Sequence, residues 1–209
     1  MEARGAAAEF LPARLSLASL QRAASRCTAC PLHEGATQTV FGDGLVRAEV
    51  MAIGEQPGDR EDLAGQPFVG PAGRVLDDGL EQAGIDPKRV YVTNAVKHFK
   101  WEQRGKRRIH QKPNQGEIEA CHPWLEAEVE VIEPDVVLLL GATAAKAVLG
   151  NSFSVTKHRG EVLESKFSSR TVATFHPSSV LRAGDDRHDA MEAFVADLGV
   201  VAGMLDRTD

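Results

Sequence analysis

A short stretch in the middle of the chain places an imidazole directly after three cations. Residues 97–112 hold seven lysine and arginine side chains and a single acid, and within this run Lys106, Arg107 and Arg108 come just before Ile109 and His110. A local cationic strip attracts phosphates, and a neutral imidazole can act as a nucleophile. We therefore expect the three cations to bind phosphates and His110 to meet the substrate. A solvated charged loop is the alternative for the cluster taken alone.

Three cysteines, Cys27, Cys30 and Cys121, form the second chemically suggestive set. An odd number of thiols cannot form a closed set of disulfides. The two-residue gap between Cys27 and Cys30 lets both thiolates approach one metal site, which either zinc or an iron–sulfur cluster could occupy. A redox-active or incidental pair remains the alternative. The histidines available as a fourth ligand are His33, His98 and His122.

Composition limits the class of protein. The chain has 209 residues, 43% hydrophobic content and a formal charge of −6, so one globular domain over residues 1–209 is expected and any polyanion site must be local. The sequence has no apolar run of about 18 residues, and residues 1–8 lack the apolar centre of a signal peptide. We expect a cytoplasmic protein that has no membrane partner and is a monomer.

Apolar runs alternate with segments of helical spacing. Expected strands cover residues 48–54, 90–96, 135–141 and 171–175, and expected helices cover residues 15–25, 72–83, 116–132, 142–149 and 187–205. Continuous apolar strands between amphipathic helices predict an α/β fold, a three-layer α/β/α sandwich around a central four-stranded parallel sheet. Residues 103–116 show neither the helical nor the strand periodicity, so His110 is expected on a loop.

The residues after each expected strand are the best candidates for binding, because ligands gather at the carboxyl ends of parallel strands. The first strand is followed by GEQPGD, in which Gly54 and Gly58 allow the backbone to approach a ligand closely. The phosphate-binding patterns GxGxxG and GxxxxGK[ST] are absent, which disfavours a nucleotide cofactor.

Five ordered motifs resemble the uracil-DNA glycosylase superfamily. They are GEQPGD (54–59), PFVGPAG (67–73), TNAVKHF (93–99), LLLGATAA (138–145) and HPSSVLR (176–182). The CxxCPL sequence at residues 27–32 is similar to the iron–sulfur branch, and the KRRIH sequence at 106–110 resembles its cross-linking UdgX type. The resemblance covers residues 27–182. It implies the α/β/α fold and uracil-containing DNA, including single-stranded DNA, as the partner.

The resemblance implies a pocket for an extruded uracil. Phe68 would stack on the base and Asn94 would pair with its O4 and N3–H. Gly54 and the backbone around Gln56 and Asp59 would complete the pocket.

The same resemblance implies the catalytic groups. His176 would donate to uracil O2 and steady the departing anion, while Glu55 and Gln56 would stabilise the cationic sugar or position its attacker. His110 would replace the attacking water and bond to C1′, so that the enzyme releases uracil and stays attached to the DNA. A turnover glycosylase and a non-catalytic DNA-binding module are the alternatives.

A [4Fe–4S] cluster is the cofactor that the resemblance implies. His98 stands where the family has a fourth cysteine, so the expected ligands are Cys27, Cys30, His98 and Cys121, with His33 and His122 as rivals for the histidine position. Ser178, Ser179 and Arg182 resemble a loop that probes the DNA minor groove, with Leu181 as a wedge.

Overall fold

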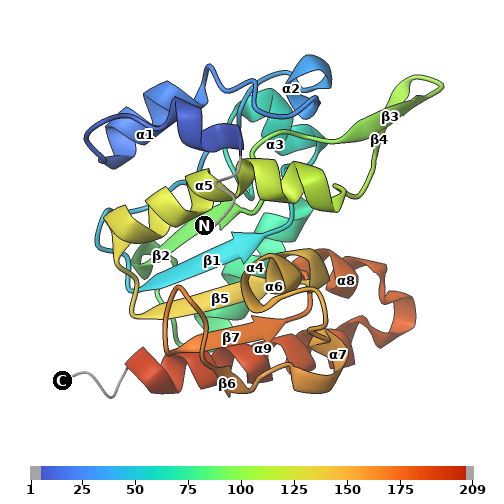
Figure 1. The fold of residues 1–209 in the computed structure, drawn as a ribbon. Helices are drawn as coiled ribbons and strands as arrows, with labels where there is room; N and C mark the ends of the chain where they lie inside the picture. Colours follow the sequence, from blue (N-terminus) through green and yellow to red (C-terminus); the bar gives the residue numbers. More distant parts are fainter. Residues whose placement is uncertain (1–5, 206–209) are drawn as a thin grey trace.

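The computed structural model describes residues 6–205; residues 1–5 and 206–209 of the predicted domain lie outside the described part. A five-stranded sheet forms the centre, with the strand order β2-β1-β5-β7-β6 (Figure 1). Its strands are β1 (Val50–Gly54), β2 (Val90–Asn94), β5 (Val136–Leu140), β6 (Val162–Leu163) and β7 (Thr171–Thr174). The four predicted strands pair in parallel, as expected. The added β6 is antiparallel to β7, and its two residues are too few to show a period.

The sheet is buried on both faces, and alternate residues of each strand enter different cores. Val50 and Ala52 of β1 pack into one apolar cluster, while Met51 and Ile53 pack into another. This is the period of two expected for a strand. Burial on both faces explains why the strands read as continuous apolar runs and not as alternating ones.

Helices cover the two faces in the expected three layers. The first core is closed by α4 (Pro71–Gln82), α8 (Pro177–Arg182) and α9 (Arg187–Leu205). The second is closed by α5 (Gln115–Ile132), α6 (Ala142–Leu149) and the single turn α7 (Val155–His158). The predicted helices are confirmed, with ends within two residues of those expected. The α/β/α prediction is therefore correct.

An N-terminal segment packs on the outer side of α5. It contains η1 (Ala6–Phe10), α1 (Leu17–Ala24) and α2 (Leu32–Gly35), and a third apolar cluster joins it to α5 around Trp124. All three cysteines lie in this cluster. Three further short elements, α3 (Asp59–Ala64), η2 (Pro87–Arg89) and η3 (Gly184–Asp186), connect the larger ones.

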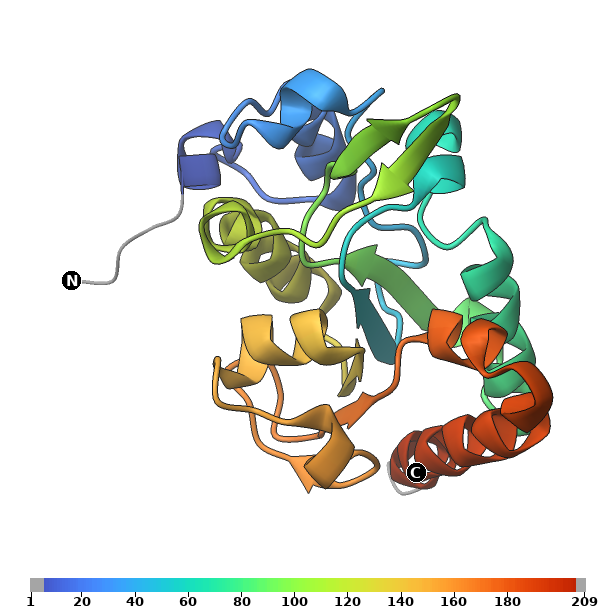
Figure 2. The same ribbon diagram turned by 90° about the vertical axis from the view of Figure 1, so that its right-hand side faces the viewer.

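The segment that carries His110 is a β-hairpin and not the expected loop. Strands β3 (Trp101–Arg104) and β4 (Arg107–His110) pair in antiparallel fashion around a turn at Gly105, whose φ is +60°. The hairpin projects from the main sheet and lies beside α3 (Figures 1 and 2). It was missed because most of its side chains are polar or charged, so they give no apolar alternation.

No helix within residues 6–205 has both the length and the apolar character needed to cross a membrane.

Candidate active site

A cavity of about 570 Å³ opens at the carboxyl ends of β1 and β5. The chain leaves β1 toward β2 on one side of it, whereas β5 lies on the other side, so this is the point where the strand order reverses. The residues that line the cavity are Glu55, Gln56, Gly58, Glu61, Phe68, Ala72, Asn94, His110, Lys112, Leu140, Gly141, Ala142, Thr143, His176, Ser178 and Arg182. Residues from five of the sequence motifs and the hairpin therefore meet in one place.

The space between the Phe68 and Asn94 side chains of the cavity requires a glycine at position 54. A Cβ atom at Gly54 would lie 2.4 Å from Asn94 Oδ1 and 2.8 Å from Phe68 Cζ. Only glycine therefore leaves room between the Phe68 ring and the Asn94 amide, which are the two groups expected to hold a base. Phe68 has a φ of 56°, a conformation that costs a non-glycine residue roughly 1–2 kcal/mol. Such strain is typical of functional sites.

His176 faces the cavity as a neutral imidazole with a defined tautomer. Burial, followed by the nearby charges of Arg182 and His110, lowers its pKa to about 4. Its Nδ1 accepts the backbone N–H of Ser178 at 3.2 Å as the N-cap of α8, so the single proton of the neutral ring is assigned to Nε2. The ring also stacks on Phe68, with centroids 6.3 Å apart and planes at 24°. His176 Nε2–H is thus a hydrogen-bond donor beside the aromatic ring.

His110 and Glu55 also line the cavity and contact each other. His110 Nε2 lies 3.3 Å from Glu55 Oε1, and the hydroxyl of Thr143 donates to Glu55 Oε2. The His110 ring is half exposed, whereas the Glu55 side chain is largely covered. A carboxylate held from both sides can accept a proton from the imidazole or stabilise a positive charge. Thr143 was not singled out from the sequence, because a threonine in the first turn of a helix carries no distinctive signal.

The side chain of Gln56 holds the base of the hairpin and is buried. Its Nε2 donates to the carbonyl oxygens of Lys100 and Gln111 at 3.2 and 2.9 Å, and its Oε1 accepts the backbone N–H of Lys100 at 3.1 Å. Lys100 and Gln111 flank β3 and β4, and their backbones are also paired, at 2.9 Å. The side-chain amide of Gln56 therefore fixes the position of His110, one residue before Gln111. In this structure it contacts the hairpin backbone, so the expected direct contact with the sugar stays a prediction.

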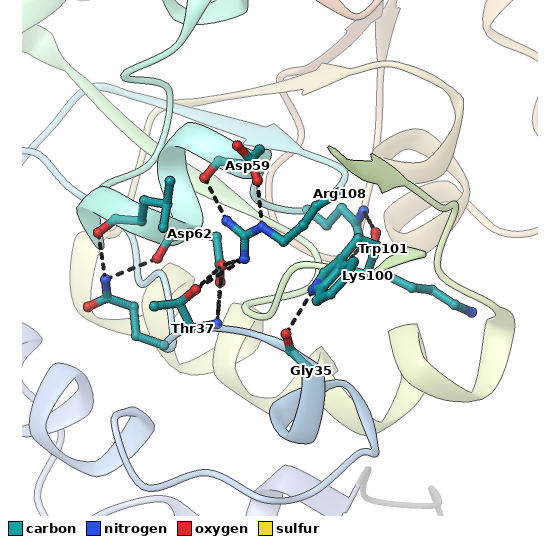
Figure 3. A network of polar contacts seen from close by, with 10 residues as sticks. Gly35, Thr37, Asp59, Asp62, Lys100, Trp101 and Arg108 are labelled. Atoms are coloured by element: carbon teal, nitrogen blue, oxygen red, sulfur yellow. Dashed lines mark hydrogen bonds and ion pairs between the residues drawn. The ribbon is translucent and has the colours of Figure 1, made fainter. Parts of the chain in front are cut away.

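The guanidinium group of Arg108 binds two carboxylates and lies over two aromatic rings of the protein (Figure 3). Its guanidinium donates to Asp59 Oδ1 and Asp62 Oδ2, each at 2.6 Å, and lies over the rings of Phe99 and Trp101 at 5.5 Å from each centroid. Asp62 is fully buried, which makes this a partly desolvated ion pair at the junction of hairpin and α3. The Asp59 carboxylate is used in the same pair and stands outside the cavity lining.

The basic run is thus less available to a ligand than its sequence suggested. Lys97 is only 1% exposed and pairs with Glu128, and Lys100 pairs with Glu117 at 2.9 Å. Lys106 and Arg107, at the tip of the hairpin, are exposed and make no ion pair with the described residues. The expectation that Lys106, Arg107 and Arg108 bind phosphates stays a prediction; the Arg108 charge is paired with Asp59 and Asp62 of α3, whereas Lys106 and Arg107 are exposed.

The Lys97–Glu128 pair lies directly beneath the cavity. Lys97 Nζ donates to Asn94 O at 2.8 Å, to Thr93 Oγ1 at 2.6 Å and to Glu128 Oε2. Glu128 Oε1 accepts from Tyr91 Oη and Thr93 Oγ1, each at 2.9 Å. The pair therefore anchors the end of β2 at Asn94. A lysine in a basic run gave no signal that it would be buried.

Helix α8 carries the remaining predicted DNA contacts, which the sequence had suggested as a loop. Ser178 Oγ is 2.8 Å from His176 Nδ1 and accepts from Arg182 Nη1 at 2.9 Å, whereas Ser179 Oγ donates to His176 O at 2.7 Å. Leu181 is 37% exposed. These contacts orient His176, and Arg182 and Ser178 also line the cavity.

The three predicted cysteine ligands lie in the apolar cluster that joins the N-terminal segment to α5. The three thiols are buried and free, and burial, with a smaller contribution from the other two cysteines, raises the pKa of Cys121 to about 12. His98 is also buried; burial and the nearby His33 lower its pKa to about 4, so its ring is neutral, the form that binds metals. Within the described residues, no three His, Cys, Asp or Glu side chains converge on a point for a single ion.

The two rival histidines differ in position. His33 lies close enough to His98 to affect its pKa, and its Nδ1 is 2.7 Å from Cys30 O. His122 instead contacts Lys166 and Glu126 and stacks on Phe167. Three buried thiols and a neutral imidazole are a donor set that suits an iron–sulfur cluster.

Fold and site together define the class: an α/β/α protein with a pocket at the sheet's switch point, lined by a stacked phenylalanine and histidine, an asparagine and a histidine–glutamate pair. The family model of the uracil DNA glycosylase superfamily matches residues 41–199. The chain belongs to this superfamily.

Relatives with stated activities are similar over most of their length. A type-4 uracil-DNA glycosylase of Thermotoga maritima is 40% identical over 158 residues, which cover 75% of this chain and 79% of the relative. A type-4 uracil-DNA glycosylase of Pyrobaculum aerophilum is 33% identical, over 80% of this chain and 86% of the relative. Another, from Archaeoglobus fulgidus, is 34% identical, over 79% and 83%.

Proposed function

We propose that this protein excises uracil from DNA and is then captured covalently through His110. The observation that carries the proposal is the contact of 3.3 Å between His110 Nε2 and Glu55 Oε1 at the wall of a cavity that also contains Phe68, Asn94 and His176. The first step, base excision, is supported by the family and by the activity named for the type-4 relatives. The second step, covalent capture, is supported by the position of His110 on the hairpin.

The cavity suits an extruded uracil. The ring of Phe68 offers a stacking face, the amide of Asn94 can pair with both an acceptor and a donor on the base edge, and Gly54 leaves the space between them open. His176 Nε2–H donates to uracil O2. As the bond between N1 and C1′ breaks, its electron pair moves to the base, and this donor stabilises the resulting anion. A neutral histidine is suitable here because its tautomer is fixed beforehand by Ser178.

The sugar is left electron-poor at C1′, and Glu55 stabilises its positive charge. In the tautomer that carries its proton on Nδ1, His110 Nε2 has a free lone pair and forms a bond to C1′; the alkylated ring then loses the Nδ1 proton to solvent and ends neutral. The proton lost from the imidazole balances the charge of the departing uracil anion. Imidazole in this product is a poor leaving group, so the protein turns over once.

The cofactor we propose is a [4Fe–4S] cluster held by Cys27, Cys30, Cys121 and His98, and it supplies structural stability when bound. Cys121 accepts the backbone N–H of Lys97 at 3.3 Å, and His98 is the next residue. His98 therefore lies on the chain that leads from Asn94 into the hairpin, and Cys121 contacts that chain at Lys97. Absorbance near 400 nm in the purified protein would support the cluster, and stoichiometric zinc in a colourless protein would contradict it.

Denaturing electrophoresis after incubation with single-stranded, uracil-containing DNA tests the function. We expect wild type to give a band shifted by the mass of the protein and His110→Ser to give free uracil with an alkali-labile abasic site. A shifted band with His110→Ser would refute His110 as the nucleophile. An alkali-labile site with wild type would favour the second candidate, a turnover glycosylase; the half-exposed position of His110 leaves room for water there. Unchanged DNA would refute both.

A further inference from the structure

A second groove adjoins the active-site cavity, between the N-terminal ends of α5 and α6. It measures about 310 Å³ and is lined by Lys112, Pro113, Gln115, Ile118, Thr143, Lys146 and Asn151. Lys112 and Thr143 line both the groove and the cavity, so the two spaces share a wall and run into one another. None of the family motifs or predicted site residues accounts for Lys112, Lys146 or Asn151.

The charge of the groove is entirely positive. Its lining contains two lysines and no acid, in a chain whose formal charge is −6. Both lysines are exposed, and within residues 6–205 neither makes a hydrogen bond or an ion pair through its ammonium group. They differ in this respect from Lys97, Lys100 and Arg108, whose charges are neutralised by carboxylates. Two unpaired cations in a concave surface attract an anion.

The position of the groove indicates which anion. Arg182 and Ser178 line the cavity alone, whereas Lys112 lines both the cavity and the groove. A strand that places one nucleotide in the cavity must continue past its rim, and the groove is the continuation with positive charge. Lysine binds phosphate as a point charge and needs no fixed geometry, so two flexible lysines suit a backbone that moves as the base is extruded.

We propose that this groove is a second DNA subsite, in which Lys112 and Lys146 bind a phosphodiester of the uridine-bearing strand within two nucleotides of the extruded base. Gln115 and Asn151 add polar contacts to the sugar–phosphate unit. The subsite rests on the proposed function, because it assumes that the cavity receives a nucleotide. It accounts for strand binding without Lys100 and Arg108, the cations that attach the hairpin to α5 and α3.

The test measures how uracil release depends on salt. The probe is a single-stranded oligonucleotide with one central deoxyuridine, under single-turnover conditions with enzyme in excess but below saturation. Each phosphate contact contributes roughly 0.7 to the slope of log rate constant against log salt on a single strand. For Lys112→Gln/Lys146→Gln, which removes the contacts to one phosphodiester, we expect a slope shallower by about 0.7, which is about a 2.6-fold smaller loss between 50 and 200 mM salt. The control, Lys88→Gln in η2, removes an exposed lysine at the opposite end of β2 and should keep the wild-type slope.

A second measurement locates the phosphate. Oligonucleotides are made with one neutral methylphosphonate at a time, at each position around the uridine. We expect one or two positions on one side to slow the wild type and to leave the double variant unaffected, because the partner of that phosphate is already gone. A variant with the wild-type slope, or with the wild-type pattern of sensitive positions, overturns the subsite. If the wild type releases no uracil, the proposed function fails instead, and the salt slope of binding, measured by fluorescence anisotropy of the same oligonucleotide, still tests the groove.

Discussion

Replacing Lys97 by methionine tests whether the buried ion pair beneath the cavity is needed. The side chains of Lys97 and Glu128 are 1% and 0% exposed, so both charges are removed from water. Lys97→Met keeps the length and apolar stem of the side chain but leaves the Glu128 carboxylate buried without a cation. Removing one partner of a buried pair costs about 3–5 kcal/mol. For a domain of 150–250 residues this lowers Tm by roughly 2–4 °C per kcal/mol, or about 6–20 °C in total.

A second substitution should recover most of that loss. Glu128→Gln keeps an oxygen that accepts from Tyr91 and Thr93 but carries no charge. The double variant Lys97→Met/Glu128→Gln should therefore be more stable than Lys97→Met by about 2 kcal/mol or more. The assay is equilibrium unfolding in guanidinium chloride, followed by the fluorescence of the buried Trp124. Uracil excision by the double variant should still be slow, because the hydrogen bond from Lys97 to Asn94 O is lost.

The matched control is Lys100→Met, which removes a lysine whose pair with Glu117 is partly exposed, at 27% and 7%. Such a pair contributes about 1 kcal/mol or less. The reasoning is refuted if Lys97→Met costs no more than Lys100→Met, or if the double variant is no more stable than Lys97→Met alone.

The site makes three further predictions. Gly54→Ala places a Cβ atom 2.4 Å from Asn94 Oδ1, so the amide must shift and excision should fall by roughly a hundredfold. Gly203→Ala in α9, where nothing lies within 4 Å, should leave excision unchanged, and equal activity of the two variants would contradict the role of Gly54. His176→Leu removes one donor to the leaving anion and should slow excision by roughly 10²–10³-fold in single-turnover assays. Because the pKa of His176 is lowered to about 4 in the folded protein from about 6.5 when unfolded, the wild type should lose up to about 3 kcal/mol of stability as pH falls from 6.5 to 4, and His176→Leu should lose less over that range. Arg108→Gln leaves Asp62 without its cation and loosens the hairpin, so a smaller fraction of excision events should end in the His110 adduct on denaturing gels. The control Arg107→Gln changes an exposed position and should keep the wild-type fraction. An equal drop in both variants would argue against the Asp62 contact.

The sequence by itself determined the layers of the fold and the set of residues around the cavity. Continuous apolar strands such as residues 136–140 have no solvated face, and only a sheet covered on both sides can bury them. Once the strands are parallel, the residues after them must meet at one edge, which is why Glu55, Asn94 and His176 could be expected at one site. These properties depend on local periodicity and on the direction of the chain.

The tertiary structure alone decided which charges are free. Lys97, Lys100, Lys106 and Arg108 have the same sequence character, yet one is buried in an ion pair, two are held by carboxylates and one is exposed at a turn. Their partners Glu128, Glu117 and Asp62 lie between 17 and 46 positions away along the chain. The free energy of a charge depends on what surrounds it in space. Neighbouring residues in the sequence do not indicate these surroundings. The anchoring of the hairpin and the groove at Lys112 and Lys146 could therefore be identified only in the folded chain.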